Sequence, residues 1–361
     1  MKEVLEMISR EPHAPRTPGH GSPPPDARSQ LSPRSSVQQI LQILRHHPES
    51  HVSGASLASR LGISRTSVWK HIQALRSKGY HIDTHPRRGY RLTAAPNLLL
   101  PEELLPRLHT QSLGRVYHHL AQTTSTNDQA MTLALQGAPH GTLVVAETQT
   151  HGRGRLQRAW TSCPHHGIYL SLILRGPFSF ERAPQVTMVS ALTLTRLIRK
   201  TWGLEAWTKW PNDILIRGRK VAGILTEAKS DQDQVHFLVM GVGINVNHLA
   251  EDLGGPFRYP ATSLAMELGH RLSRAEFLAA YLDSFEADFQ RWSNEAFDSF
   301  SEEWESTSWV LNRTITLRGA HAVLSGRVVG FSSEGALRLL QQDGTEILVW
   351  AGDVVHVEGI T

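Results

Sequence analysis

The feature that most restricts the fold is an apolar run that leads directly into a loop of glycine and arginine. Residues 143–146 (Leu-Val-Val-Ala) have the composition of a buried strand, and residues 152–160 read Gly-Arg-Gly-Arg-Leu-Gln-Arg-Ala-Trp. Glycine lets the backbone approach a ligand closely, and arginine presents a planar fork of donors to carboxylates or phosphates. The stretch predicts a strand followed by a loop that binds a large anionic ligand with an aromatic portion. The alternative is a solvated basic hairpin tip.

Two further stretches bear on the same ligand. Residues 209–213 read Lys-Trp-Pro-Asn-Asp between apolar runs, and Ser125-Thr126-Asn127 opens a helical pattern that Gly137 closes. A helix start offers hydroxyls and backbone N–H groups, which suit a neutral amide- or urea-like group; simple capping is the alternative. The region has arginines for phosphates and a lysine, but no evident nucleophile or pair of catalytic carboxylates. Adenylation needs no more, because the substrate's own carboxylate attacks the α-phosphate of ATP.

In their order and composition these motifs resemble those of the biotin–protein ligases, over roughly residues 36–361. The resemblance implies that the acid is biotin, that ATP with Mg²⁺ is the co-substrate, and that a lysine of a biotin carboxyl carrier protein receives the biotinyl group. For members with an N-terminal winged helix, it also implies a homodimer that holds biotinyl-5′-AMP and represses an operator DNA.

Carried over by position, the resemblance assigns contacts with biotin or its adenylate to Ser125, Thr126, Asn127, Gln149, Arg153, Gly154, Arg155, Lys209, Gly223 and Ile224. Catalysis is expected from Lys209, Arg153 and Arg155, and contact with the ATP phosphates from Arg158 and Asn212. A structural ion pair is the alternative for Lys209. No metal site is expected at His165-His166, which lack further spaced ligands.

Three other features qualify this expected site. The chain has Leu156-Gln157 at the loop tip, where many family members have Arg-Gly, and this difference bears on how ordered the tip is. Gly241 and Gly243 end a strand at a point where the backbone must come close to another group. Residues 248–262 are weakly patterned and contain glycine and proline, which predicts a mobile loop over the ligand.

The segment before residue 96 has the pattern of a winged helix-turn-helix. Apolar residues at helical spacing predict helices from Ser36, over 56–61 and over 65–78, with Ser64 as an N-cap. Residues 80–83 and 89–92 read as the strands of the wing. Between Ser36 and Ala95 there are nine Arg or Lys residues and two acidic residues, which indicates a polyanionic partner such as DNA.

The residues expected to contact DNA are Arg65, Thr66, Ser67, Lys70, Arg87 and Arg88. Trp69 faces outward on the same helix, and the sequence leaves open whether it faces DNA or packs against the wing. The alternative for this whole segment is a small helical domain that binds protein and carries solvated charges.

The remaining patterns define an α+β fold class. We expect a disordered tail over 1–35, where seven of the nineteen prolines lie, and a winged-helix domain over 36–95. Residues 96–307 predict a catalytic domain with a mixed or mainly antiparallel sheet and helices on one side. Residues 308–361 contain five short strands separated by glycines, which predict a small SH3-like barrel.

Composition limits where the protein works. Cys163 is the only cysteine of 361 residues, so no intramolecular disulfide can form and a reducing compartment is favoured. No apolar run is long enough to span a membrane, and the N-terminus has no signal-peptide core, so the expected location is the cytoplasm.

The function that the resemblance implies is that of a biotin–[acetyl-CoA-carboxylase] ligase that also acts as a repressor of biotin genes. The alternatives are a DNA-binding biotin sensor without enzyme activity and a relative of the lipoate ligases. Lys209 and the three loop arginines favour an enzyme, because a sensor need not stabilise the transition state of adenylation. Trp160 and the Lys-Trp-Pro-Asn-Asp run fit the biotin branch better than the lipoate branch.

Overall fold

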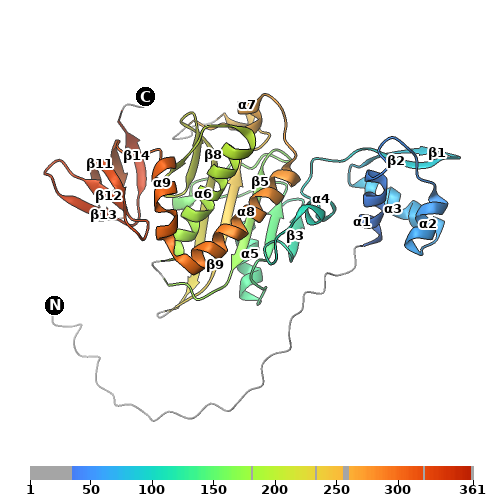
Figure 1. Ribbon diagram of the computed structural model, residues 1–361, viewed down its shortest axis with the longest axis horizontal. Helices are drawn as coiled ribbons and strands as arrows, with labels where there is room; N and C mark the ends of the chain where they lie inside the picture. Colours follow the sequence, from blue (N-terminus) through green and yellow to red (C-terminus); the bar gives the residue numbers. More distant parts are fainter. Residues whose placement is uncertain (1–34, 180–181, 232–233, 255–259, 320–321, 359–361) are drawn as a thin grey trace, which may run out of the picture.

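The computed structural model describes residues 35–179, 182–231, 234–254, 260–319 and 322–358. Figure 1 shows a winged-helix unit at one end of the molecule, a central sheet with its helices, and a second small sheet at the other end. The tail predicted over residues 1–35 lies outside the described residues, except for Ser35. The α+β class and the order of its parts are as predicted.

Three helices and a two-stranded wing form the N-terminal unit. Each helix begins after a serine whose hydroxyl accepts a hydrogen bond from the first turn: Ser35, Ser53 and Ser64. The second helix starts two residues earlier than predicted because Ser53 caps it. The elements are α1 (Ser36–Arg45), α2 (Gly54–Leu61), α3 (Arg65–Ser77), β1 (His81–His85) and β2 (Gly89–Ala94).

The central sheet has seven strands in the order β3-β4-β5-β9-β8-β7-β6. Strands β3 and β4 are parallel and the other neighbours are antiparallel, so the mixed sheet predicted from the short turns is confirmed. The strands are β3 (Tyr117–Leu120), β4 (Leu143–Ala146), β5 (Ile168–Leu174), β6 (Ala206–Lys209), β7 (Asp213–Ile216), β8 (Arg219–Ser230) and β9 (Val235–Ile244).

Helices cover both faces of this sheet, whereas the sequence predicts helices on one side only. Helices α6 (Ala183–Trp202) and α8 (Arg274–Glu295) pack together on one face (Figure 1). Helix α5 (Thr126–Leu135) packs on the other face, against residues such as Val144 and Val239. Every residue of β4 and β5 is buried, as expected of strands covered on both faces. The helix itself was predicted between Ser125 and Gly137, but its apolar pattern does not show which face of the sheet it covers.

The C-terminal sheet is antiparallel, with the order β13-β12-β11-β10-β14, as expected for the small SH3-like domain. Its strands are β10 (Thr314–Arg318), β11 (Val323–Phe331), β12 (Leu337–Leu340), β13 (Glu346–Val349) and β14 (Asp353–Val357). The remaining helices are α4 (Pro101–Leu104), α7 (Leu264–Leu268) and α9 (Ser301–Thr307), with short 3-10 turns between elements. In the part of the chain that the structure describes, no helix is both long and apolar enough to cross a membrane.

The winged-helix unit is attached to the central part through two buried carboxylates of α4. Glu103 accepts a hydrogen bond from the Tyr80 hydroxyl at 2.6 Å and forms an ion pair with Arg45. Glu102 lies 2.5 Å from Lys78 Nζ. The end of α1 and the segment between α3 and β1 are therefore both held by one short helix.

Candidate ligand-binding site

A cavity lies on the α5 face of the central sheet, with the end of β9 as part of its floor. A Cβ at Gly241 would lie 2.1 Å from Asn127 Oδ1, and one at Gly243 would lie 2.5 Å from the Trp160 ring. These glycines let the start of α5 and the loop tryptophan lie against the sheet. They explain the close approach that the sequence predicted at this strand end.

The cavity brings together every residue predicted to bind biotin, its adenylate or the ATP phosphates. These residues come from the start of α5, the segment that leads from β4 through the Gly-Arg loop, the end of β6 with the turn to β7, and the first half of β8. The twelve that line the cavity are Ser125, Thr126, Asn127, Gln149, Arg153, Gly154, Arg155, Arg158, Lys209, Asn212, Gly223 and Ile224.

The start of α5 carries a fixed set of polar groups. Ser125 is the N-cap residue, yet its side chain makes no capping hydrogen bond, so simple capping does not account for it. Thr126 donates its backbone N–H and its hydroxyl to Gln149 Oε1, at 2.8 and 3.2 Å. Asn127 Nδ2 donates to Glu227 Oε2 at 2.6 Å. The arrangement offers donors and acceptors in fixed positions to a neutral polar group.

The Gly-Arg loop, residues 152–160, folds back on itself as a narrow hairpin. Trp160 N–H donates to Gly152 O at 2.8 Å, and Gly154 N–H donates to Arg158 O at 2.7 Å. At the tip, Leu156 and Gln157 have φ angles of 56° and 57°. This left-handed region suits glycine better than other residues, and it is where the chain lacks the Arg-Gly of many family members.

Arg153 lies between two carboxylates. Its guanidinium is 2.6 Å from Asp128 Oδ1 and 3.2 Å from Glu227 Oε1. Burial by itself lowers the pKa of Arg153, but the two carboxylates outweigh burial and raise this pKa. The side chain is thus held as a cation at the edge of the cavity.

The other two loop arginines have different surroundings. Arg155 Nη1 lies 3.4 Å from Asn212 Oδ1, and burial lowers the pKa of Arg155. A desolvated guanidinium of this kind interacts strongly with an anionic ligand. Arg158 reaches out of the loop and pairs with Asp353, with Nη1 3.2 Å from Oδ1. This ion pair joins the Gly-Arg loop to the C-terminal sheet.

Two lysines line the cavity, and only Lys209 was predicted from the sequence. That residue is 3% exposed at the end of β6. Lys220 is more accessible, and its Nζ lies 2.7 Å from Asp213 Oδ1 and 5.3 Å from the centre of the Trp160 ring. The hairpin at Arg217-Gly218-Arg219 pairs Lys220 with Leu215, and this register, which the sequence does not show, brings the lysine side chain within reach of Asp213.

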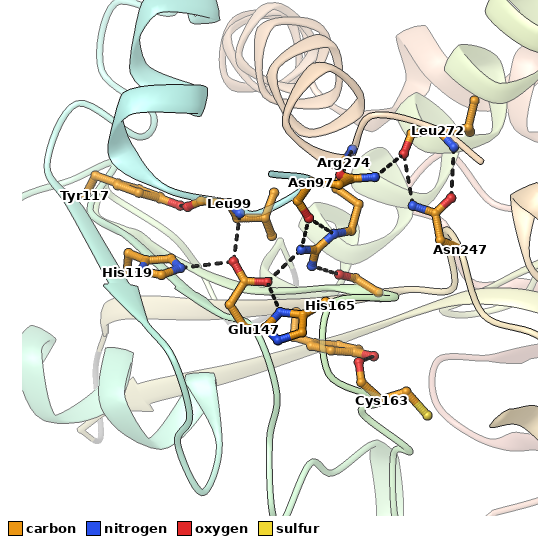
Figure 2. A network of polar contacts seen from close by, with 12 residues as sticks. Asn97, Leu99, Tyr117, His119, Glu147, Cys163, His165, Asn247, Leu272 and Arg274 are labelled. Atoms are coloured by element: carbon orange, nitrogen blue, oxygen red, sulfur yellow. Dashed lines mark hydrogen bonds and ion pairs between the residues drawn. The ribbon is translucent and has the colours of Figure 1, made fainter. Parts of the chain in front are cut away.

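Glu147, the residue that follows β4, belongs to the buried ion-pair network shown in Figure 2. The Glu147 and Arg274 side chains are 3% and 0% exposed and lie 2.6 Å apart. Glu147 also accepts hydrogen bonds from Leu99 N–H at 2.7 Å and from His119 Nε2 at 3.0 Å. Arg274 N–H donates to Asn97 Oδ1 at 3.0 Å. Residues 97–99, just after the wing, are therefore bound to the segment that leads into Gln149.

The histidines and the cysteine near the loop are occupied by other contacts. His165 Nδ1 lies 3.3 Å from Glu147 and His166 Nδ1 lies 2.6 Å from Asp252. Burial raises the pKa of Cys163 to about 11, which makes it a poor nucleophile at neutral pH. Within the described ranges, no group of three or more His, Cys, Asp or Glu side chains is arranged to hold a metal ion.

The predicted DNA-contact residues lie on one helix and on the wing. Arg65, Thr66 and Lys70 of α3 are exposed, as are Arg87 and Arg88 between β1 and β2.

Ser67 differs from the other predicted DNA contacts. It is half-buried, its N–H donates to Ser64 Oγ at 3.0 Å, and the two hydroxyl oxygens are 2.9 Å apart. These contacts place Ser67 in the cap of α3.

Of the loop predicted over residues 248–262, residues 255–259 lie outside the described residues. Its two flanks reach the cavity through Leu253 and Ala261. The backbone of Lys220 hydrogen-bonds to Pro260 O at 2.8 Å and to Thr262 N–H at 2.9 Å.

Three family models match the chain in the order of its parts. An HTH domain matches residues 36–91, the Biotin/lipoate A/B protein ligase family matches residues 119–245, and the Biotin protein ligase C terminal domain matches residues 310–357.

Similar proteins match along nearly the whole chain. The Bifunctional ligase/repressor BirA of Bacillus subtilis is 35% identical over 89% of this chain and 99% of its own. The protein of the same name from Escherichia coli is 30% identical over 84% of this chain and 92% of its own. A solved biotin protein ligase from Aquifex aeolicus, in complex with biotin and ATP, superposes with a TM-score of 0.58 at 29% identity. That match covers 66% of this chain and 97% of the solved chain.

Proposed function

This chain belongs to the bifunctional biotin ligase/repressor family, and we propose that it attaches biotin to a carrier protein with ATP and represses transcription at an operator. The observation that carries the proposal is the cavity, which gathers twelve residues predicted from two separate motifs and a helix start. One site then offers polar groups for a neutral ring system, arginines for phosphates and lysines for the reacting anions.

In the first step, a carboxylate oxygen of biotin attacks the α-phosphorus of ATP. The bond from this phosphorus to the oxygen that bridges to the β-phosphate breaks, and pyrophosphate leaves. Arg153, Arg155 and the cavity lysines neutralise charge on the two anions and on the phosphate oxygens of the transition state. Mg²⁺ enters with ATP as part of the co-substrate.

We assign positions within the cavity as follows. Ser125, Thr126, Asn127 and Gln149 hold the neutral ring of biotin, and Gly223 and Ile224 flank it through the β8 backbone. Lys209 and Lys220 lie by the carboxylate and the α-phosphate, while Arg158 and Asn212 serve the ATP phosphates. The support for this assignment is that all these residues line one cavity.

In the second step, the neutral amine of a carrier lysine attacks the carbonyl carbon of biotinyl-5′-AMP. The carbon–oxygen bond to AMP breaks, AMP leaves with the electron pair, and the amine loses its proton. Until then the Gly-Arg loop keeps water from the mixed anhydride, which would otherwise hydrolyse.

The partners follow from the same reasoning. The protein acts on a biotin carboxyl carrier protein, binds operator DNA through α3 and the wing, and forms a homodimer when it holds biotinyl-5′-AMP. It works in the cytoplasm, where ATP, DNA and the carrier protein are all available. We divide the chain into a winged-helix domain (36–95), a catalytic domain (96–307) and a C-terminal domain (308–361).

Pyrophosphate release from Mg-ATP tests the ligase. Release should require biotin, should not be supported by lipoate, and should be followed by transfer of biotin to an added carrier domain. Tight biotin binding without release would mean a sensor, and release with lipoate would mean the lipoate branch. Gel filtration of the same samples should show a dimer only with biotin and ATP together.

Variants of the two cavity lysines test their assigned roles. Lys220→Ala and Lys209→Ala should each slow adenylation by about 10²-fold or more, because charge stabilisation of the transition state is lost. Lys200→Ala is the matched control, since Lys200 is an exposed lysine at the end of α6. A Lys209 variant that releases pyrophosphate at the control rate would leave Lys220 as the catalytic lysine.

A further inference from the structure

Trp69 is the exposed tryptophan of α3, and neither the ligase site nor the predicted set of DNA contacts includes it. It is 53% exposed, so about half of its surface is open to solvent and to a partner. The opposite face of α3 forms the core of the winged-helix unit, where Val68, Ile72 and Leu75 are fully buried. Packing within the unit therefore does not explain why position 69 holds a large aromatic residue.

The neighbours of Trp69 point to its partner. Side chains three and four positions apart lie side by side on a helix, so Trp69 adjoins Arg65 and Thr66 one turn earlier. Arg65, Thr66 and Lys70 are all exposed. An apolar ring surrounded by donors and cations matches a surface with apolar groups and many acceptors, which a DNA groove presents.

The wing places further cations near the same partner. The backbone N–H groups of Arg87 and Arg88 each lie 3.3 Å from His85 Nδ1, which fixes the turn that carries the two exposed guanidinium groups. Asp83, one of the two acidic residues of this unit, lies 3.2 Å from His51 Nε2 and 3.7 Å from Arg91 Nη2. Because Asp83 is paired in this way, it does not cancel the positive charge that Arg87 and Arg88 present on the wing.

We propose that Trp69 reads operator bases, with its indole ring against the C5-methyl group of a thymine in the major groove. The inference rests on the proposed repressor function and assigns the side chain that gives this function its sequence preference. Among base edges, only thymine presents a methyl group in the major groove, and apolar contact with it is an established form of direct readout. Arg65, Lys70, Arg87 and Arg88 contact phosphates and set the position of the helix without selecting sequence.

The test begins with the duplex that wild-type protein, supplied with biotin and Mg-ATP, selects from a random-sequence pool. Affinity for this duplex and for a scrambled duplex of equal composition is measured for the wild type, Trp69→Ala and Trp350→Ala. Trp350 directly follows β13 of the C-terminal sheet and is 51% exposed, so its variant is a matched control for loss of an exposed indole. Trp69→Ala should lose about tenfold or more in affinity for the selected duplex and keep its affinity for the scrambled one.

Replacement of single thymines by uracil in the selected duplex removes only the methyl group. One such replacement per half-site should weaken the wild type and leave Trp69→Ala unaffected. Lys70→Ala should instead weaken both duplexes and lower the slope of affinity against salt concentration by about one.

Three outcomes would overturn the inference. The first is an equal loss of affinity for both duplexes with Trp69→Ala. The second is a lower melting temperature of this variant, or loss of its dimer. The third is that the variant keeps the wild-type preference for the selected duplex. Failure of the wild type to select any duplex would instead remove the repressor function itself. The two failures are therefore distinguishable.

Discussion

Two residues at the tip of the Gly-Arg loop have a backbone conformation that glycine adopts more easily than any other residue. Leu156 and Gln157 both have φ near +56°, and Leu156 is 68% exposed, so no packing of its side chain offsets the cost. The cost for a residue other than glycine is about 1 kcal/mol or more.

Gln157→Gly should therefore stabilise the closed loop and slow the release of biotinyl-5′-AMP, by a factor of about two to five. The measurement is the dissociation rate of labelled adenylate. Ala159→Gly is the comparison, because Ala159 lies outside the positive-φ positions and pairs with Arg153 as an isolated bridge. Faster release from both variants would show that the tip is not strained.

At the same scale, the sequence identified the residues that line the cavity better than it identified the side chains that hold them in place. The motif residues were predictable because they are consecutive and chemically unusual. Asp128 and Glu227, which hold Arg153, are separated from it by long stretches of chain and belong to ordinary helix and strand patterns. Lys220 was missed for a related reason: its place beside Asp213 depends on how the hairpin is paired.

At the scale of elements, the Glu147–Arg274 pair joins the end of β4, the start of α8 and the residues that follow the wing. Burial by itself raises the pKa of Glu147, but the hydrogen bonds from His119 and Arg274 outweigh burial and lower the pKa to about 2. The folded state thus holds Glu147 ionised at pH values where the unfolded chain protonates it. Its stabilising contribution is present above about pH 4.5 and is lost as the pH falls towards 2.

Buried His248 acts in a neighbouring pH window. Burial lowers its pKa from 6.5 to about 4, so acid favours the unfolded, protonated form over that range.

Glu147→Gln should lower the free energy of unfolding by about 3 kcal/mol at pH 7, because it leaves the Arg274 cation unpaired.

This variant should also flatten the loss of stability below pH 4.5 while the slope between 6.5 and 4.5 persists. Urea unfolding at several pH values measures both effects. An unchanged slope below pH 4.5 would contradict the role given to Glu147.

The accuracy of prediction from sequence varied most among the helices and strands. The second and third helices and the two strands of the winged-helix unit were predicted to within two residues, and the five strands of the C-terminal sheet were predicted in number, since Ser64 marks the start of α3 and glycines separate those strands. The placement of α5 on the opposite face of the sheet was not found. A sequence pattern shows that a strand is buried on both faces, but it does not show which helix does the covering.

At the scale of the whole molecule, Glu102 and Glu103 set how the winged-helix unit sits on the rest of the chain. Burial, together with the hydrogen bond to Glu103, raises the pKa of Tyr80 well above its ordinary value, so the phenol stays a donor. Glu103→Gln should loosen the unit and weaken operator binding by about tenfold, while biotin-dependent pyrophosphate release stays near wild type.

The control is Glu49→Gln, which makes the same change of charge at an exposed position of the same unit. DNA affinity and pyrophosphate release are measured for both variants. If both bind the operator alike, the attachment through α4 has no part in DNA binding.

The hydrogen bonds of Asn97 and Leu99 bear on how such proteins are assembled from interchangeable modules. These two residues follow the wing in the sequence, but their partners, Glu147 and Arg274, belong to the catalytic half. A chimaera that exchanges the DNA-reading module should therefore be joined before Asn97. A junction only a few residues later would carry part of the support of the biotin site away with the discarded module.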